Sequence, residues 1–397
     1  MIRLGLRMLM GQTARWLGVV LGVLLCTFLI THMLSMFSGM MRRSYALVTD
    51  IPEARIWIMD PAVEYVDEPA GMPPTALTRV RGVAGVAWAV PLYTGSTRVR
   101  LPSGALKPIL LIGVDDATLI GAPRDLVSGS LDALKGSDAV IIDSSSAGGL
   151  LRTIDERPQR HEGWNPPHLD APTRPMRAGD EMLANDHRLV VVGVARLTPR
   201  FLAKPVVYTT YSRALFVTPR QRNLMSFVLA APAESQDATA VARRIETETG
   251  LRARTSAEFA ADTYWYYVRT TGVVARIALM IGIAVIVGVS VSSLLLYLFT
   301  VDNARYYVTF KTLGASTSLI LAIVAVQALF SGATGFGMGV GASALVGSTV
   351  NVEAMPYALT PWTLLFAGVV VLMVCVVSAV LSAMRVLKLD IGTVFKG

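Results

Sequence analysis

The sequence predicts a membrane protein with four transmembrane helices and one large α+β domain, placed outside the cytoplasm between the first and second helices. Hydrophobic residues make up 53% of the 397-residue chain, and charged residues make up 16%, below the ~25% typical of soluble domains. Four apolar runs, at residues 16–37, 277–299, 319–346 and 362–383, are long enough to cross a ~30 Å hydrocarbon core. Residues 42–270 instead contain prolines, charges and short alternating segments, which are typical of a folded polar domain.

Residues 1–41 form the first predicted domain, an amphipathic segment followed by the first transmembrane helix. Arg3, Arg7 and Arg15 flank the amphipathic segment. A cleavable signal peptide would have a shorter apolar core and a small-residue cleavage site. We therefore expect a retained helix with its N-terminus in the cytoplasm; a cleaved signal peptide is the alternative.

Residues 42–270 form the second predicted domain, and its two ends share one pattern. Each end predicts a strand, a helix and a second strand. These elements are, in order, a strand at 54–59, a helix at 73–81, a strand at 86–92, a strand at 226–230, a helix at 237–249 and a strand at 251–255. The arrangement indicates a split, pseudo-repeated α+β module with the remainder of the domain inserted between its halves.

The inserted part is predicted to contain further strands. A hairpin is expected over residues 98–114, with Pro102-Ser103-Gly104 as its turn. Strands are expected at 138–143, 188–196 and 205–210. A loop at 156–175 is crowded with Pro, His and Asn, and the sequence does not indicate its function.

Residues 257–276 are compatible with one helix that carries four consecutive aromatic residues, Tyr264, Trp265, Tyr266 and Tyr267. Aromatic side chains with a polar tip gather at membrane interfaces. We predict a stalk helix that enters the second span from outside. An ordinary helix of the soluble domain is the alternative.

The link between the second and third spans, residues 302–316, is short, polar and basic. The positive-inside rule places such a loop in the cytoplasm. The segment is too short to fold alone, so its helix needs a partner surface, and its aromatic side chains are of the kind that anchor interfaces. Gly314 lies at the expected helix end, where a left-handed backbone conformation is common. A loop that only connects two helices is the alternative. The residues singled out are Asp302, Arg305, Tyr306, Tyr307, Phe310, Lys311, Leu313, Gly314 and Ala315.

Residues 271–397 form the third predicted domain, which holds spans two to four. In the third span, Gly335 and Gly339 form a small-xxx-small pattern, which predicts close helix packing. The loop at 351–360 contains Glu353 and no Lys or Arg, whereas basic residues follow the fourth span. Both termini are therefore expected in the cytoplasm.

The amino-acid sequence of the predicted cytoplasmic loop resembles that of a known protein family. Thr312-Leu313-Gly314-Ala315-Ser316, after a charged segment, resembles the first cytoplasmic loop of FtsX-like permeases, the membrane subunits of MacB-like ABC transporters. Segments at 54–60, 85–92 and 185–195 are similar to strands of their outer domain, and 387–397 is similar to their C-terminal signature. The resemblance implies an outer domain of the MacB periplasmic-core type and an FtsX-like permease domain at 271–397. The pattern is nearer the four-span, DevC-like subgroup.

Three positions depart from the family pattern. Asp302-Asn303 stands where a glutamate is usual near the start of the loop, Gln327 replaces a glutamate often found in the third span, and Ile391 replaces a usual proline. The first two changes bear on how an ATPase would dock and leave the expected topology unchanged.

The resemblance further implies a function and partners. The chain would be a non-enzymatic permease subunit of an ABC exporter in a bacterial inner membrane, acting on an amphiphilic or lipid-like substrate. It would transmit ATP hydrolysis by a separate cytoplasmic ATPase, which uses ATP and Mg²⁺, to movement of the outer domain; no cofactor is expected on this chain. No Gly-x-x-x-x-Gly-Lys-[Ser/Thr] occurs, so this sequence does not supply the P-loop. The expected partners are the ATPase, a second copy of the chain, a periplasmic adaptor and membrane lipids.

Other functional classes stay open at this point. The same architecture serves FtsX-type regulators that activate an outer enzyme such as a cell-wall hydrolase, and a haem or metal efflux permease is a second alternative. A sensor-type signalling partner has less support because no kinase segment is attached. Nucleic acid is not expected despite the net charge of +8, because no Lys/Arg-rich block accompanies it.

A few residues are weaker site candidates. His32, Met36 and Met40 follow i, i+4 spacing, so they share one helix face and could hold haem or copper; methionine packing at a dimer seam is the alternative. His161, His168 and His187 match no standard metal-ligand spacing, and we predict no metal site. Ser144-Ser145-Ser146 lacks the context of a nucleophile elbow and is expected to be a turn.

Overall fold

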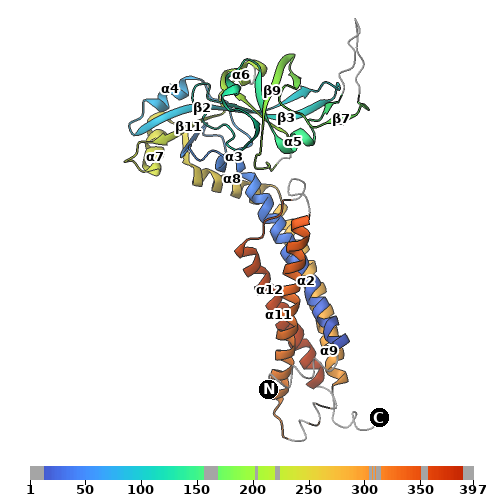
Figure 1. Cartoon of the computed structure of the whole chain (residues 1–397). Helices are drawn as coiled ribbons and strands as arrows, with labels where there is room; N and C mark the ends of the chain where they lie inside the picture. The colour runs from blue at the N-terminus through green and yellow to red at the C-terminus, as the bar shows by residue number, and fades with distance from the viewer. Residues whose placement is uncertain are drawn as a thin grey trace. The chain divides into compact units, whose positions relative to one another are not determined.

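The computed structural model describes residues 13–155, 169–201, 204–219, 224–303, 306, 309, 314–349 and 356–387 (Figure 1). The backbone contacts divide the chain into two compact units. One consists of residues 41–270, and the other combines residues 1–40 with residues 271–397.

The second of these units is built from long apolar helices. They are α2 (Thr13–Ser44), α9 (Val273–Asp302), α11 (Thr317–Thr349) and α12 (Pro361–Leu387). Within the described residues, four segments are long and apolar enough to span a membrane: Trp16–Ser44, Val273–Phe299, Leu321–Thr349 and Pro361–Ser382. The four predicted spans are therefore confirmed as helices, and α2 continues past the expected end at residue 37 to Ser44.

Close packing in the helical unit depends on the glycines of α11. A Cβ added to Gly335 would lie 2.8 Å from the Cβ of Val23, and one added to Gly339 would lie 2.6 Å from the Cβ of Thr27. Both contacts are with α2, and both are shorter than side chains tolerate. The small-xxx-small pattern therefore brings α11 against α2, as the sequence predicts.

We predict that Gly339→Leu lowers the thermal unfolding midpoint of the full-length protein in detergent micelles. The new side chain must displace Thr27 or the α2 backbone, and overpacking of this kind costs about 1–3 kcal/mol. The control is Gly341→Leu on the same helix, where an added Cβ has no atom within 4 Å. Equal midpoints for the two variants would contradict the packing described here.

The domain at 41–270 begins and ends with the two predicted strand–helix–strand units, and they interleave. The first unit is β1 (Ile56–Met59), α4 (Thr75–Arg81) and β2 (Val86–Arg100); the second is β11 (Phe227–Pro232), α7 (Ala238–Thr249) and β12 (Arg252–Thr255). Their strands lie in the order β12-β1-β11-β2, with antiparallel neighbours. This is the split βαβ arrangement of ferredoxin-like folds.

Side-chain alternation gives this sheet two buried faces. Ile56 and Ile58 of β1 pack with residues of α4 and α7, whereas Trp57 and Met59 belong to a second core on the opposite face. Helix α7 has well-defined ends, because the Asp237 carboxylate accepts a hydrogen bond from the Ala240 amide and Gly250 closes the helix at φ +69°.

The inserted part extends the same sheet through β2. Beyond β11, the strand order continues β2-β3-β10-β5-β9-β4, and β8 pairs with both β2 and β9. The added strands are β3 (Leu106–Val114), β4 (Leu126–Gly129), β5 (Ala139–Asp143), β8 (Glu181–Ala184), β9 (His187–Ala195) and β10 (Val206–Thr210). Short elements complete this part: α3 (Ala46–Thr49), a 3-10 turn (Asp132–Lys135), α5 (Ser144–Gly148), β6 (Thr153–Ile154), β7 (Thr173–Arg174) and α6 (Tyr211–Val217).

Two predictions of local structure were wrong. Separate strands were expected at 86–92 and 98–101, but β2 is continuous from Val86 to Arg100 and pairs with β3 from Tyr93↔Gly113 to Arg100↔Leu106. Gly95, within this continuous strand, lies beneath the ring of Tyr93; a Cβ there would lie 2.8 Å from the Tyr93 Cζ.

The single helix expected over 257–276 is two helices. Helix α8 covers Ser256–Thr270, and α9 begins at Val273. Gly272 between them adopts φ +64°, a left-handed conformation that an α-helix cannot include.

Candidate functional site

The predicted ATPase-coupling loop begins where α9 ends. The side-chain amide of Asn303 donates a hydrogen bond to the Phe299 carbonyl at 2.7 Å and caps the helix after Asp302. Tyr306 is 60% exposed, and Gly314 adopts φ +88°, the left-handed conformation that the sequence predicts for it. Ala315 is half-buried. The remaining loop candidates lie outside the described residues: Arg305, Tyr307, Phe310, Lys311 and Leu313.

At the other end of α9 in the sequence, α8 is anchored in the core of the outer domain. Phe259 is fully buried, and its ring centroid lies 5.7 Å from Trp57 and 5.8 Å from Phe227. Trp57 lies on β1 and Phe227 on β11, the two central strands of the ferredoxin-like half. Helix α8 is therefore packed directly against these strands.

A second set of contacts holds the C-terminal part of α8, and we refer to Tyr65, Asp67, Phe201, Tyr266 and Tyr267 as the Tyr267 cluster. The Tyr267 hydroxyl donates a hydrogen bond to Asp67 Oδ2 at 2.6 Å, and its ring lies 4.2 Å from that of Phe201. Tyr266 stacks on Tyr65 with ring centroids 3.9 Å apart. The residues that contact this part of α8 come from two distant segments of the chain. Phe201 lies about 60 residues before α8, and Tyr65 and Asp67 lie about 200 residues before it.

The four aromatic residues predicted for the stalk therefore divide into two groups. Tyr266 and Tyr267 contact the outer domain, whereas Trp265 is 52% exposed and lies beneath the guanidinium of Arg269 at 5.8 Å. Tyr264 packs against Trp265. A location of this group at the membrane interface stays a prediction.

The Asp67 side chain is partly buried, and charged groups lie near it. Burial raises the pKa of its carboxyl group, while the Tyr267 hydroxyl and the positive charges of Arg200 and Lys204 act in the opposite direction. The Arg200 side chain is 3% exposed; it forms an ion pair with Asp50 at 2.9 Å and donates to the Tyr208 hydroxyl at 3.2 Å. Burial raises the pKa of the Tyr267 hydroxyl, and so does the nearby Asp67 carboxylate. Tyr267 therefore remains a neutral donor.

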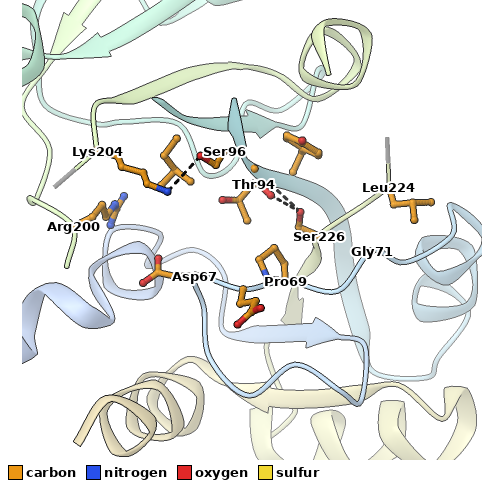
Figure 2. Close-up of a pocket in the computed structure, with 13 residues that line it drawn as sticks. Asp67, Pro69, Gly71, Thr94, Ser96, Arg200, Lys204, Leu224 and Ser226 are labelled. Atoms are coloured by element: carbon orange, nitrogen blue, oxygen red, sulfur yellow. Dashed lines mark hydrogen bonds between the residues drawn. The ribbon is translucent and has the colours of Figure 1, made fainter. Parts of the chain in front are cut away.

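A cavity of about 630 Å³ adjoins the Tyr267 cluster (Figure 2). Figure 2 shows Asp67, Arg200 and Lys204 at one side of the cavity and Leu224 at the other. Lys204 Nζ lies 3.4 Å from the Ser96 hydroxyl, and the Ser226 hydroxyl donates to the Thr94 carbonyl at 3.0 Å. The lining comprises Asp67, Glu68, Pro69, Gly71, Tyr93, Thr94, Gly95, Ser96, Leu110, Arg200, Lys204, Leu224 and Ser226. Sequence reasoning gave no indication of it, because these residues come from distant segments.

The weaker candidates are placed as follows. His32 is 8% exposed, with its ring 5.4 Å from that of Phe28 and 5.6 Å from that of Tyr357; Met36 and Met40 are half-buried. His187 packs on Phe216 at 4.4 Å. His161 and His168 lie outside the described residues. Within the described part of the chain, no three His, Cys, Asp or Glu side chains are grouped as metal ligands.

The serine stretch at 144–146 forms helix α5. The Asp143 carboxylate caps it by accepting hydrogen bonds from the Ser146 amide and hydroxyl at 3.2 and 3.1 Å. These serines thus form the first turn of a short helix that Asp143 caps, where the sequence predicted only a turn.

Comparison with protein-family models shows which class of protein this chain belongs to. Residues 17–248 match the family model of the MacB-like periplasmic core domain, and residues 266–391 match that of the FtsX-like permease C-terminal region. With its four apolar helices and the α+β domain between the first and second, the protein is a membrane permease subunit of the ABC-transporter type. The chain belongs to the MacB/FtsX-like permease family. These matches do not distinguish the DevC-like subgroup.

Solved structures similar to the outer domain are distant in sequence. They include the extracellular domain of the ABC-type transporter YknZ from Gram-positive bacteria (16% identity, 50% of this chain and 98% of that chain, TM-score 0.32). The periplasmic region of MacB from Actinobacillus actinomycetemcomitans is a second (12% identity, 54% and 94%, TM-score 0.36). A domain of a permease protein from Porphyromonas gingivalis is a third (14% identity, 51% and 91%, TM-score 0.31). No curated protein sequence matches this chain significantly.

We predict that Asp67→Asn flattens the pH dependence of stability of the full-length protein. Because the pKa of the folded carboxyl group is raised, Asp67 contributes stability that is fully present below its unfolded pKa of ~3.9 and is lost as the pH rises through the folded pKa. The amide carries no charge, and its oxygen still accepts from Tyr267. The variant should therefore unfold at a higher temperature than the unmodified protein at pH 7, and the two midpoints should converge near pH 4.

Thermal unfolding followed by circular dichroism between pH 4 and pH 8 measures this effect. Asp132→Asn serves as the control, because the Asp132 side chain is 88% exposed. The interpretation of Asp67 is wrong if Asp67→Asn is the less stable protein at pH 7, since the ionised carboxylate would then be stabilised by Arg200 and Lys204.

Proposed function

We propose that this chain is the permease subunit of an ABC exporter that converts ATP hydrolysis on a separate cytoplasmic ATPase into movement of its outer domain. The observation that carries this proposal is the anchoring of α8. Phe259 attaches the helix to the sheet, and Tyr267 attaches it to Asp67. Helix α8 ends at Thr270, and after two connecting residues α9 begins at Val273 and leads to the 302–316 loop. One continuous stretch of chain therefore links the expected ATPase-docking loop to the centre of the outer domain.

The break at Gly272 refines how this transmission would work. A single rigid rod from the loop to the domain is not available, because α8 and α9 are separate helices. A short, two-residue connection still passes on a pull or a push along the chain, and Gly272 can absorb a change of direction. We propose that movement of α9 is passed through this connection to α8 and then to β1 and β11.

The remaining parts of the proposal follow the family. Two copies of the chain would pair in a bacterial inner membrane, with both termini in the cytoplasm and residues 41–270 outside. A periplasmic adaptor would receive the substrate, which we propose is amphiphilic or lipid-like. Support for these parts comes from the apolar helices, whose outward-facing side chains, such as Leu21, Ile286 and Leu372, suit contact with lipid or with a second copy.

A flexible insertion tests the transmission. We predict that Gly-Ser-Gly-Ser placed after Thr271 abolishes export while ATP hydrolysis continues, because a slack connection transmits no force. Transport and ATPase activity are measured together in proteoliposomes containing the permease and its ATPase. The same insertion after Ser103, in the turn between β2 and β3, is the control and should leave export intact. Normal export with the Thr271 insertion would exclude α8 as the transmitter.

Loop substitutions test the ATPase partnership. We predict that Phe310→Asp and Gly314→Val abolish co-purification with the ATPase, while both variants still insert in the membrane. Phe310 is expected to fill an apolar pocket of the partner, and valine is strained at the φ of +88° that Gly314 adopts. Leu359→Asp, in the described loop before α12, is the control. Retention of the ATPase by both loop variants would remove the main support for the permease function.

A further inference from the structure

The cavity beside the Tyr267 cluster has the size and lining of a ligand site. Its volume of about 630 Å³ falls within the range of ~300–1,000 Å³ that small-molecule sites occupy. Such sites combine apolar walls with a few polar groups that fix the orientation of the ligand. Here Leu110, Pro69 and Leu224 supply apolar surface. The charged side chains of Asp67, Arg200 and Lys204 lie together on one side (Figure 2).

The charges on that side favour an anion. Within the described part of the chain, Lys204 forms no ion pair within 4 Å, and its Nζ lies 3.4 Å from the Ser96 hydroxyl; its charge also acts on the nearby Asp67 carboxyl group. Arg200, which is paired with Asp50, places a second, fixed positive charge in the wall; its Nε makes no hydrogen bond with any residue that the structure describes. A ligand anion at Lys204 would gain a charge-assisted hydrogen bond and the attraction of a nearby buried cation.

The carboxylates of the lining are already engaged. Asp67 accepts the Tyr267 hydroxyl at 2.6 Å, and Glu68 accepts the Tyr65 hydroxyl at 2.7 Å. Asp50, which pairs with Arg200, does not line the cavity. The ammonium of Lys204 is thus the charged group of the lining best placed to receive an acidic ligand, and the Ser96 hydroxyl lies beside it at 3.4 Å.

We propose that this cavity binds an amphiphilic organic anion, whose acidic group contacts Lys204 and Ser96 and whose apolar body lies along Leu110 and Leu224. The proposal rests on the proposed export function only in treating this ligand as the transported class. The site also borders the transmission element, because Asp67 both lines the cavity and holds Tyr267 of α8. A ligand that fills the cavity therefore contacts a residue on which the position of α8 depends.

Photolabelling of the full-length protein tests the proposal without the ATPase. The protein is placed in nanodiscs of phosphatidylcholine and irradiated with 4-benzoylbenzoate, and labelled peptides are identified by mass spectrometry. The matched probe is 4-benzoylbenzamide, which has the same apolar body and no charge. We expect saturable labelling by the acid, but not by the amide, of peptides containing residues 93–96, 110 or 224.

Two variants and one control define the site. Lys204→Gln should raise the half-saturating concentration of the acid at least about tenfold, because a charge-assisted hydrogen bond is lost. Leu224→Trp should prevent labelling by filling the cavity without changing its charge. Lys135→Gln removes a lysine that does not line the cavity and should label like the unmodified protein.

The outcomes separate the sources of the anion and decide the proposal. If added phosphatidylglycerol suppresses labelling, the natural ligand is an anionic lipid; if labelling is unchanged, it is a free organic acid. Equal labelling by acid and amide, or unchanged labelling of Lys204→Gln, would overturn the proposal. Those results would leave the ATPase co-purification test untouched, so failure of the site and failure of the permease function can be told apart.

Discussion

The burial of Phe259 between Trp57 and Phe227 is the interaction that fixes α8 to the sheet of the outer domain. Three large rings, each fully buried, join α8 to the two central strands of the ferredoxin-like half. Separating them would expose several hundred Å² of apolar surface, at about 25 cal/mol per Å². This packing holds helix α8 against the sheet. The same helix continues through Gly272 into α9, so under the proposed mechanism its attachment would determine what a movement of α9 can do.

The helices of the membrane unit associate by a different interaction. The hydrophobic effect contributes little to helix association in lipid, because lipid tails are as apolar as the helix surfaces. Gly335 and Gly339 let α11 approach the backbone of α2 closely, and this contact relies on van der Waals packing. Packing by small residues resists separation of helices but contains few directional bonds. The outer domain instead has hydrogen bonds and ion pairs that fix orientation, such as Tyr267–Asp67 and Arg200–Asp50.

The sequence alone predicts those features whose signal is local. The strand–helix–strand units follow from alternating residues and from helix ends marked by Asp237 and Gly250, and the spans follow from apolar length. Two local signals misled. The turn residues Pro102-Ser103-Gly104 predicted a hairpin that starts at residue 98, although the pairing of β2 with β3 starts at Tyr93, and the helix-compatible residues around Gly272 concealed a break. The partners of Tyr267 could not be predicted, because Asp67 and Phe201 are near it only after the sheet has formed.

The candidate site shows why this long-range assembly matters for function. Asp67 is close to both the cations of the cavity wall and the hydroxyl of Tyr267, so the electrostatic state of the cavity and the hold on α8 share one carboxyl group. An anion beside Lys204 would add negative charge near Asp67 and further favour its protonated form. The hydrogen bond from Tyr267 is stronger to an ionised than to a neutral carboxyl group. Occupation of the cavity would therefore weaken the Tyr267–Asp67 hydrogen bond while the Phe259 anchor remains, and under the proposed mechanism this is how a ligand would alter the movement passed through α8.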